Sequence, residues 1–423
     1  MACSASTCQS NCYRDQPQEE EEDAKHTNTN SIATNTISNN NRNNSHGLCL
    51  KCKANPPISA DTHADDSRFC ADCFRANLFG KFRFAVTSNA MISPTDNVLV
   101  AFSGGPSSSE QDNAIGDITS IVENLALPTK QLYVVPIESV YSEDSGDGRE
   151  RLKKLLDAVP DATGREDLLL HLRMLALQKI ASQNGYNRLL LGSCISRIAC
   201  HVITATVKGQ GYSLPADIQY VDSRWEIPVL LPLRDCLAQE LNMLCRLDGL
   251  KTVDFIRSPG SGINGLVSSF VSLLQEENPS RECTIVRTAG KLIPFHFNRI
   301  QEIDDSNVPL ATRRRQKRYN LKPNECFSSE SFCFICNGPL SKSDLLSLRN
   351  LEQCQTSPDT FVGACCSSCR FQVLPQDPSL LDQFSAVLPR QLVARVKHDN
   401  LDNYSVLREQ IQDCLLSESD DET

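Results

Sequence analysis

The feature that constrains this chain most is a short apolar strand that runs directly into a glycine-bearing hydroxyl turn. The stretch from Asn97 to Ser109 reads NVLVAFSGGPSSS, with Gly104 and Gly105 at the turn. Glycines can take positive φ and let the backbone approach a phosphate closely, and successive N–H groups in such a turn form an anion-binding nest. The combination of strand and loop predicts a nucleotide-binding α/β domain.

The turn is neither a Walker A sequence nor a Gly-x-Gly-x-x-Gly dinucleotide fingerprint. It resembles the PP-loop, Ser-Gly-Gly-x-Asp-Ser, of ATP pyrophosphatases that adenylate a carbonyl before nitrogen or sulfur replaces the oxygen. Ser103, Gly104, Gly105 and Ser108 match this pattern, whereas Ser107 stands where the family has aspartate. A hydroxyl is a poorer ligand than a carboxylate for a hard cation. The five residues are therefore predicted to form a degenerate nucleotide-binding loop.

Length and charge limit the classes of function. With 423 residues the chain is long enough for about two to four domains. It carries 42 Lys and Arg against 52 Asp and Glu, a net charge of −10, so contact with a nucleic acid must use local basic patches. No apolar run approaches the ~18 residues of a transmembrane helix, and no signal sequence is apparent. We expect a soluble, cytoplasmic protein that binds neither membranes nor DNA.

The cysteine spacing indicates metal binding. The chain has 20 cysteines, and because cytosolic thiols stay reduced, paired Cys-x-x-Cys motifs point to metal rather than to disulfides. The first two pairs predict two knuckles that meet over one structural Zn²⁺; the alternative is four unrelated buried thiols. The predicted ligands are Cys49, Cys52, Cys70 and Cys73.

A second quartet near the C-terminus predicts a second structural zinc site. Its ligands are Cys333, Cys336, Cys366 and Cys369. Cys365 is an alternative to Cys366, but only Cys366 lies two residues before Cys369 in the spacing that a knuckle needs.

The chain between the quartets alternates apolar runs and helical periodicity. Strands are expected at 131–137, 188–191 and 227–231, and helices at 115–127, 149–158 and 166–183 and through Leu237, Leu241 and Leu244. This order predicts a doubly wound parallel sheet whose ligands lie beyond the carboxyl ends of the strands. Gly192 and Ser193 follow one such strand and are predicted to join the nucleotide site.

Other polar residues give weaker signals. His171 and His201 lack a partner base or nucleophile at a defined spacing, so no catalytic residue is predicted. One concentrated basic run is predicted to contact tRNA phosphates, the alternative being a solvated linker. It contains Arg313, Arg314, Arg315, Lys317 and Arg318.

From Cys49 to about Cys414 the chain resembles the cytoplasmic tRNA 2-thiolation protein 2 family, in a plant version. The segments that carry the resemblance are FCADCF (69–74), KFR (81–83), AFSGG (101–105), LGSCISRIA (191–199), KGQGY (208–212), PLRD (232–235) and the late cysteine quartet. The resemblance implies a heterodimer with a catalytic PP-loop subunit that acts on the wobble uridine of Lys, Glu and Gln tRNAs. It further implies that sulfur arrives as the thiocarboxylate of a ubiquitin-related modifier protein.

Several parts of the implied chemistry are missing from this chain. The second catalytic motif of the PP-loop enzymes, Gly-His-x-x-Asp-Asp, here reads GSCISR from Gly192 to Arg197 without a carboxylate, and no Cys-x-x-Cys lies between the loop and this motif. We therefore expect a non-catalytic subunit, with ATP and Mg²⁺ bound by the partner. The alternatives are that the chain itself is an ATP-dependent tRNA sulfurtransferase, or a zinc-module adaptor in ubiquitin-like protein conjugation.

The expected organisation follows from these segments. The polar, acidic composition of residues 1–47 predicts disorder. The rest is divided into an N-terminal zinc ribbon with a docking helix (48–80), a degenerate PP-loop α/β domain (81–290), a basic linker (291–325), a C-terminal zinc ribbon (326–375) and a helical tail with an acidic end (376–423). Residues 110–130 are too few for the helix, strand and helix of a doubly wound fold, so one strand of the sheet is expected to be absent.

Overall fold

A computed structural model describes residues 48–58, 68–101, 119, 131–141, 147–250, 262–278, 280–298, 331–345 and 361–396. The chain divides into two units, 1–47 and 48–423, and every described residue belongs to the second. The expected disorder of 1–47, the expected helix at 115–127 and the basic linker fall outside the described residues, apart from helical Thr119 and the start of the linker.

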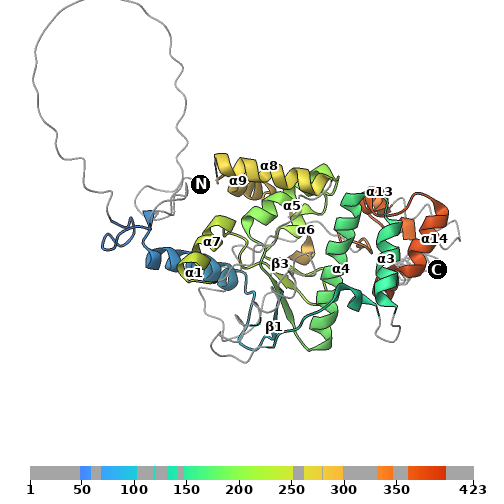
Figure 1. The fold of residues 1–423 in the computed structure, drawn as a ribbon, viewed down its shortest axis with the longest axis horizontal. Helices are drawn as coiled ribbons and strands as arrows, with labels where there is room; N and C mark the ends of the chain where they lie inside the picture. Colours follow the sequence, from blue (N-terminus) through green and yellow to red (C-terminus); the bar gives the residue numbers. More distant parts are fainter. Residues whose placement is uncertain are drawn as a thin grey trace, which may run out of the picture. The chain divides into compact units, whose positions relative to one another are not determined.

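The sheet has four strands in the order β1-β2-β4-β3 (Figure 1). They are β1 (Val98–Ala101), β2 (Arg188–Leu191), β3 (Val221–Asp222) and β4 (Val229–Leu230). β1 and β4 each pair in parallel with β2, and β3 pairs antiparallel with β4. The class is therefore α/β with a mainly parallel sheet, as the alternation of strands and helices predicts.

Helices cover the sheet and extend away from it. They are α1 (Ala71–Ser88), α3 (Gly148–Ala158), α4 (Ala162–Gln183), α5 (Ile195–Val207), α6 (Leu214–Asp217), α7 (Ala238–Leu247), α8 (Ile263–Glu277), α9 (Ser280–Ala289), α13 (Ser367–Gln372) and α14 (Pro378–Val387), with 3-10 turns η2 (Ile137–Val140) and η3 (His296–Asn298). The predicted helices at 149–158, at 166–183 and through Leu237 are confirmed as α3, α4 and α7. α4 begins earlier than predicted because the Asp161 carboxylate accepts a hydrogen bond from Gly164 N at 2.9 Å and caps the helix.

The strand predicted at 131–137 is wrong. Residues 131–136 have no regular structure and lead into η2. The backbone N–H and C=O groups of a strand must pair with a neighbouring strand. Residues 131–137 have no such neighbour in the described sheet, where β1 pairs only with β2. The apolar side chain of Val134 is consequently exposed, and Tyr133 makes an edge-on ring contact with Tyr186 at 6.3 Å.

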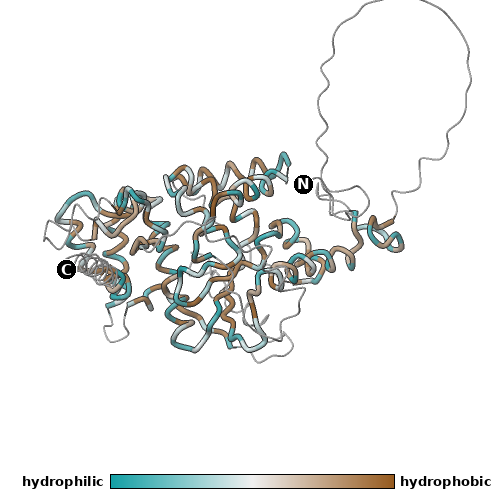
Figure 2. Tube along the Cα trace, turned by 180° about the vertical axis from the view of Figure 1, so that it is seen from behind, coloured by the Kyte–Doolittle hydropathy of each residue, from teal (hydrophilic) through white to brown (hydrophobic). Residues whose placement is uncertain are grey.

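The largest apolar core lies between α3, α4 and the C-terminal segment, rather than against the sheet. Leu155 of α3 and Leu168 and Leu172 of α4 are fully buried there with Phe334 and Phe384. α4 lies between the sheet and α3 (Figure 1), and hydrophobic stretches recur along these packed helices (Figure 2). A smaller core joins α5 and α9, and a third surrounds Leu189 of β2.

Candidate metal centres

The N-terminal cysteines converge on one point. The sulfurs of the four predicted ligands, Cys49, Cys52, Cys70 and Cys73, all lie within 4.8 Å of one another. Cys52 Sγ and Cys70 Sγ are 3.8 Å apart. A tetrahedral zinc ion with Zn–S bonds of about 2.3 Å holds neighbouring sulfurs about 3.8 Å apart. The spacing of the thiols therefore suits a single tetrahedral ion.

Local backbone structure places these cysteines. Lys53 N donates to Cys49 O at 2.9 Å, and Lys53 has a φ of +55°, so the chain folds back sharply after Cys52. Positive φ is uncommon for a residue with a side chain. The second pair is not a second knuckle, as the spacing predicts, but the first turn of α1: Cys70 is its N-cap, and Phe74 N donates to Cys70 O at 2.9 Å.

The C-terminal cluster repeats this design. The sulfurs of Cys333, Cys336, Cys366 and Cys369 also lie within 4.8 Å of one another, and Cys336 Sγ and Cys366 Sγ are 3.8 Å apart. Asn337 has a φ of +56° and its N donates to Cys333 O at 2.8 Å. Cys366 is the N-cap of α13. In both clusters, the first Cys-x-x-Cys motif thus forms a knuckle and the second lies at the start of a helix.

Two backbone N–H groups donate to sulfurs of the C-terminal cluster. Gly338 N donates to Cys336 Sγ at 3.3 Å, and Cys369 N donates to Cys366 Sγ at 3.4 Å. Cys365 is buried outside the quartet, and burial is the main reason that the pKa of its thiol is raised. The structure therefore brings Cys366, and not Cys365, to the other three sulfurs.

In the N-terminal cluster, the pKa values of Cys49 and Cys73 are shifted in opposite directions. Burial opposes ionisation of Cys49, yet backbone hydrogen bonds from Cys52 and Cys70 lower its pKa to about 6. Hydrogen bonding with Cys70, followed by burial, raises the pKa of Cys73 to about 12. A bound cation removes this conflict because it supplies positive charge to all four sulfurs.

The carboxyl end of β2 holds the remaining predicted site residues that the structure describes. Gly192 has open space where a side chain would lie, and Gly192 and Ser193 lead into α5. Ser196 Oγ donates to Glu282 Oε2 of α9 at 2.6 Å. Glu282 is 1% exposed, burial raises its pKa, and its Oε1 has no hydrogen-bond partner among the described residues.

This edge therefore differs from a magnesium site. Its nearby carboxyl group is held inside the packing of α5 and α9, and within the described ranges only the two cysteine quartets gather three or more metal-ligating side chains around one point. The predicted loop residues Ser103, Gly104, Gly105, Ser107 and Ser108, and the basic run from Arg313 to Arg318, lie outside the described residues. Their roles stay predictions.

Comparisons with known proteins give a consistent set of relatives, although no family model matches the chain. The chain is 52% identical to cytoplasmic tRNA 2-thiolation protein 2 of Arabidopsis thaliana, with all of both chains covered. It is 46% identical to the protein of the same name from Oryza sativa subsp. indica, over 88% of this chain and 90% of the relative. Cytoplasmic tRNA 2-thiolation protein 2-A of Xenopus laevis is 22% identical over 88% and 95%.

The first of these alignments spans 468 positions, whereas this chain has 423 residues, so the Arabidopsis protein has residues that this chain lacks. Among solved structures, the U34-tRNA thiolase from Methanococcus maripaludis with its 4Fe-4S cluster is 16% identical, covers 62% of this chain and 93% of its own, and has a TM-score of 0.39. Within the described part of the chain, no helix combines the length and apolar character needed to cross a membrane.

Proposed function

The chain belongs to the cytoplasmic tRNA 2-thiolation protein 2 family, and from that membership we propose that it is a non-catalytic subunit of the cytoplasmic complex that 2-thiolates the wobble uridine of tRNA. The observation that carries the proposal is 52% identity to a family member over the whole of both chains. Lys, Glu and Gln tRNAs are the proposed substrates, and the thiocarboxylate of a ubiquitin-related modifier protein is the proposed sulfur donor.

The assignment of catalysis to a partner rests on the residues after β2. Adenylation of the uridine 2-oxygen needs Mg²⁺ to neutralise the triphosphate, and Mg²⁺ is held by carboxylates. The segment Gly192–Arg197 offers none, and Ser107 replaces the aspartate of the first loop. The nearby Glu282 is buried, with a raised pKa and a hydrogen bond to Ser196. ATP and Mg²⁺ are therefore assigned to the partner subunit.

The two cysteine quartets are proposed to hold structural Zn²⁺. Sulfurs within 4.8 Å of one another suit four ligands on one ion, whereas a 4Fe-4S cluster spreads its cysteines over separate irons. Metal analysis of the purified chain is expected to give two zinc ions per chain and no iron. Iron with acid-labile sulfide would contradict this assignment.

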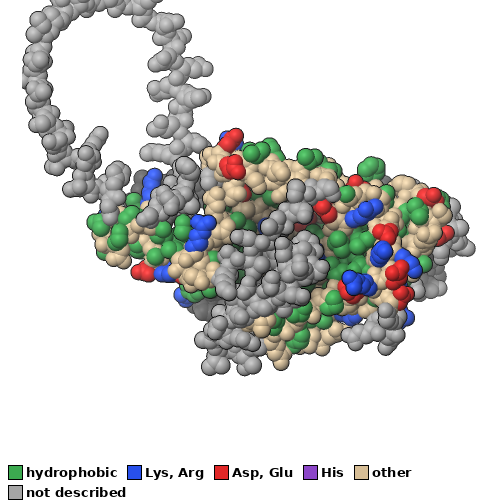
Figure 3. Space-filling view, viewed as in Figure 1, with side chains coloured by type: hydrophobic (Ala, Val, Ile, Leu, Met, Phe, Trp, Pro, Cys, Tyr) green, Lys and Arg blue, Asp and Glu red, His purple; other side chains and the backbone are tan. Residues whose placement is uncertain are grey.

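One helix face supports a protein partner. On α8, Leu266, Phe270 and Leu273 are 74%, 50% and 60% exposed, while Val267 and Val271 on an adjacent side of the helix are buried. Hydrophobic side chains follow α8 along the surface (Figure 3), and residues 263–275 include no charged residue. Such an uncharged apolar stripe is typical of a subunit interface and unsuited to RNA. We assign this face to the catalytic subunit.

Two measurements test these assignments. Phe270→Glu is expected to abolish co-purification with the catalytic subunit, whereas Ser269→Glu, at an exposed neighbouring position, should retain it. Reconstituted with the partner, the chain should support formation of 2-thiouridine, and alone it should release no AMP from ATP in the presence of substrate tRNA. AMP release by the chain alone, at the rate of the pair, would instead make it the enzyme.

A further inference from the structure

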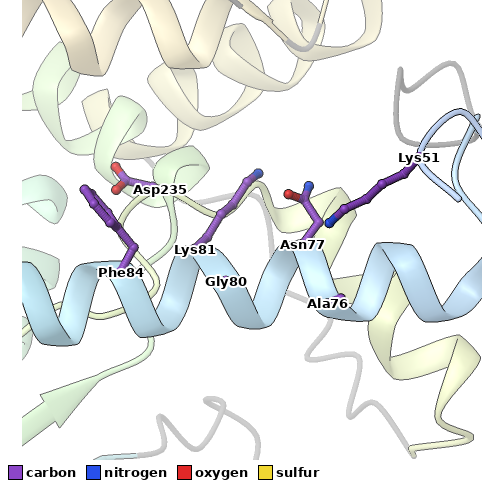
Figure 4. Close-up of a pocket in the computed structure, with 7 residues that line it drawn as sticks. All are labelled: Lys51, Ala76, Asn77, Gly80, Lys81, Phe84 and Asp235. Carbon is purple, nitrogen blue, oxygen red and sulfur yellow. The ribbon is translucent and has the colours of Figure 1, made fainter. Parts of the chain in front are cut away.

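A groove of about 350 Å³ runs along one side of α1, close to the N-terminal cysteine cluster. Its floor is formed by the small residues Ala76 and Gly80, and Gly80 has no atom within 4 Å of the position where a Cβ would lie. Asn77, Lys81 and Phe84 project from α1 beside this floor (Figure 4). The groove exists because the helix carries no large side chain at two positions one turn apart.

The zinc knuckle supplies one end of the groove. Lys51 lies between Cys49 and Cys52, and its side chain reaches from the knuckle toward Asn77 (Figure 4). It forms no ion pair with a described residue. The folded knuckle therefore places the ammonium group of Lys51 at one end of the groove.

Two more cations, one on the knuckle and one on α1, have no acidic partner among the described residues. Lys53 is exposed on the same knuckle, and Arg83 is exposed on α1, one turn beyond Gly80. Lys81, by contrast, is paired with the buried carboxylate of Glu240. In a chain of net charge −10, these exposed cations form a local basic patch, and such a patch favours a polyanionic ligand.

Aromatic rings accompany these cations. Phe84 lines the groove and is 48% exposed, and Phe79 on the same helix is 64% exposed. Exposed aromatic rings beside cations are the surfaces on which unstacked nucleobases bind, because every base has a π-face. The bases of a duplex are already stacked on one another, so these rings favour single-stranded or looped RNA.

We propose that the α1 groove binds a single-stranded segment of RNA, with the phosphates at Lys51 and Arg83 and a base stacked on Phe84. Asn77 offers an amide between these two ends, which can hydrogen-bond to a base edge or a ribose hydroxyl. The identification of this RNA as the unpaired anticodon loop of a substrate tRNA rests on the proposed function. Asp235, whose carboxylate accepts from Tyr220 Oη at 2.7 Å, closes the Phe84 end.

Substitutions of Gly80 give the sharpest test, because comparing a large with a small side chain there separates the effect of filling the groove from the effect of changing the helix. Gly80→Leu places a side chain on the floor, whereas Gly80→Ala leaves most of the groove open and raises helix propensity. The probe is a labelled anticodon stem-loop RNA, compared with a duplex of the same base composition, bound to the full chain. We expect Gly80→Leu and Phe84→Ala to weaken stem-loop binding about tenfold, with Gly80→Ala at the wild-type affinity and duplex binding unchanged.

Lys51→Ala tests the phosphate contact. It should weaken binding and reduce the slope of log affinity against log salt concentration by the amount that one phosphate contact contributes. Lys153→Ala, which removes an exposed lysine of α3, is the matched control and should leave the slope unchanged. Zinc content and circular dichroism verify that each variant is folded.

The outcomes separate this proposal from the proposed function. If the wild-type pair thiolates tRNA but Gly80→Leu binds the stem-loop as tightly as Gly80→Ala does, the groove proposal is overturned and the proposed function stands. The proposal would also be overturned if Phe84→Ala weakened duplex binding as much as it weakened stem-loop binding. The same holds if Gly80→Leu abolished the binding of a poly-glutamate peptide and left RNA affinity unchanged. If thiolation does not depend on the chain at all, the proposed function itself fails.

Discussion

The N-terminal and C-terminal cysteine clusters share one backbone design and differ in their surroundings. Each has a residue of positive φ after its knuckle and a second cysteine pair in the first turn of a helix. In the C-terminal cluster, Cys333 and Cys369 belong to the largest apolar core, together with Leu168 and Leu172 of α4. In the N-terminal cluster Cys52 is exposed.

The two clusters also differ in how they are attached to the α/β domain. The C-terminal knuckle is bonded to the body through Asn337, whose Nδ2 donates to Arg224 O at 3.2 Å, and Arg224 is held by Asp217 and Asp222 at 2.7 Å each. The N-terminal cluster continues into α1, which packs on α7 through a small core that includes Phe74 and Leu78.

Ligand spacing therefore sets the geometry of each metal site, whereas the surroundings set what the site does. A cluster inside the main core stabilises the fold, because its loss exposes apolar surface that other elements depend on. A cluster outside that core can instead place an exposed side chain such as Lys51 beside a groove. The predictions below test this division.

The largest effect is expected for Cys369→Ser. Losing a ligand of the C-terminal site should remove the proposed zinc and open the core against α4, which should lower the free energy of unfolding by about 4 kcal/mol or more. Chemical denaturation followed by circular dichroism measures this change. Cys245→Ser, at a partly buried cysteine outside both quartets, is the control, and a Cys369→Ser midpoint equal to that of the control would refute the structural role.

Gly164→Ala should give the next largest effect. A Cβ at this position of α4 would lie 2.0 Å from Gln372 O, at the end of α13. One of the two helices must move, at a loss of about 1–3 kcal/mol. Thermal unfolding of the full chain measures this loss, and an unchanged midpoint would mean that α13 does not pack tightly on α4.

Cys52→Ser should have a smaller effect on the body. Cys52 is exposed, so loss of the proposed zinc should open the knuckle locally, while the free energy of unfolding of the α/β domain changes by less than about 1 kcal/mol. Hydrogen exchange should show lost protection in residues 48–58 and retained protection in α4. Exchange that rises equally in both regions would remove the distinction between the clusters.

The smallest expected effect is a gain in stability from Gly80→Ala. The position is helical and open, so alanine should stabilise α1 by up to about 1 kcal/mol. Together with Gly164→Ala this gives two identical substitutions in helices with opposite expected signs. A destabilised Gly80→Ala would indicate that the open side of α1 is packed against another part of the chain.

The sequence predicts best those features that depend on nearby residues. Cys-x-x-Cys spacing is local, so all eight cysteines of the two clusters were identifiable. The apolar periodicity of α4 and the run of β2 at 188–191 are also local; β2 forms with the predicted bounds, and α4 forms with the predicted end and an earlier start.

Features that depend on distant partners were missed. The run at 131–137 has strand-like composition but finds no ladder partner in the described sheet. The burial of the C-terminal cluster depends on contacts with α3 and α4, and the groove is lined at one end by Lys51 of the knuckle and at the other by Phe84 near the end of α1. Neither juxtaposition leaves a signal in local spacing.

The most direct test of the account is the 2-thiouridine content of wobble positions in tRNA from cells that lack this chain. Nucleoside mass spectrometry of purified Lys, Glu and Gln tRNAs should find the 2-thio group lost without the chain and restored when the wild-type chain is returned. An equal thiolated fraction with and without the chain would contradict its role in the complex.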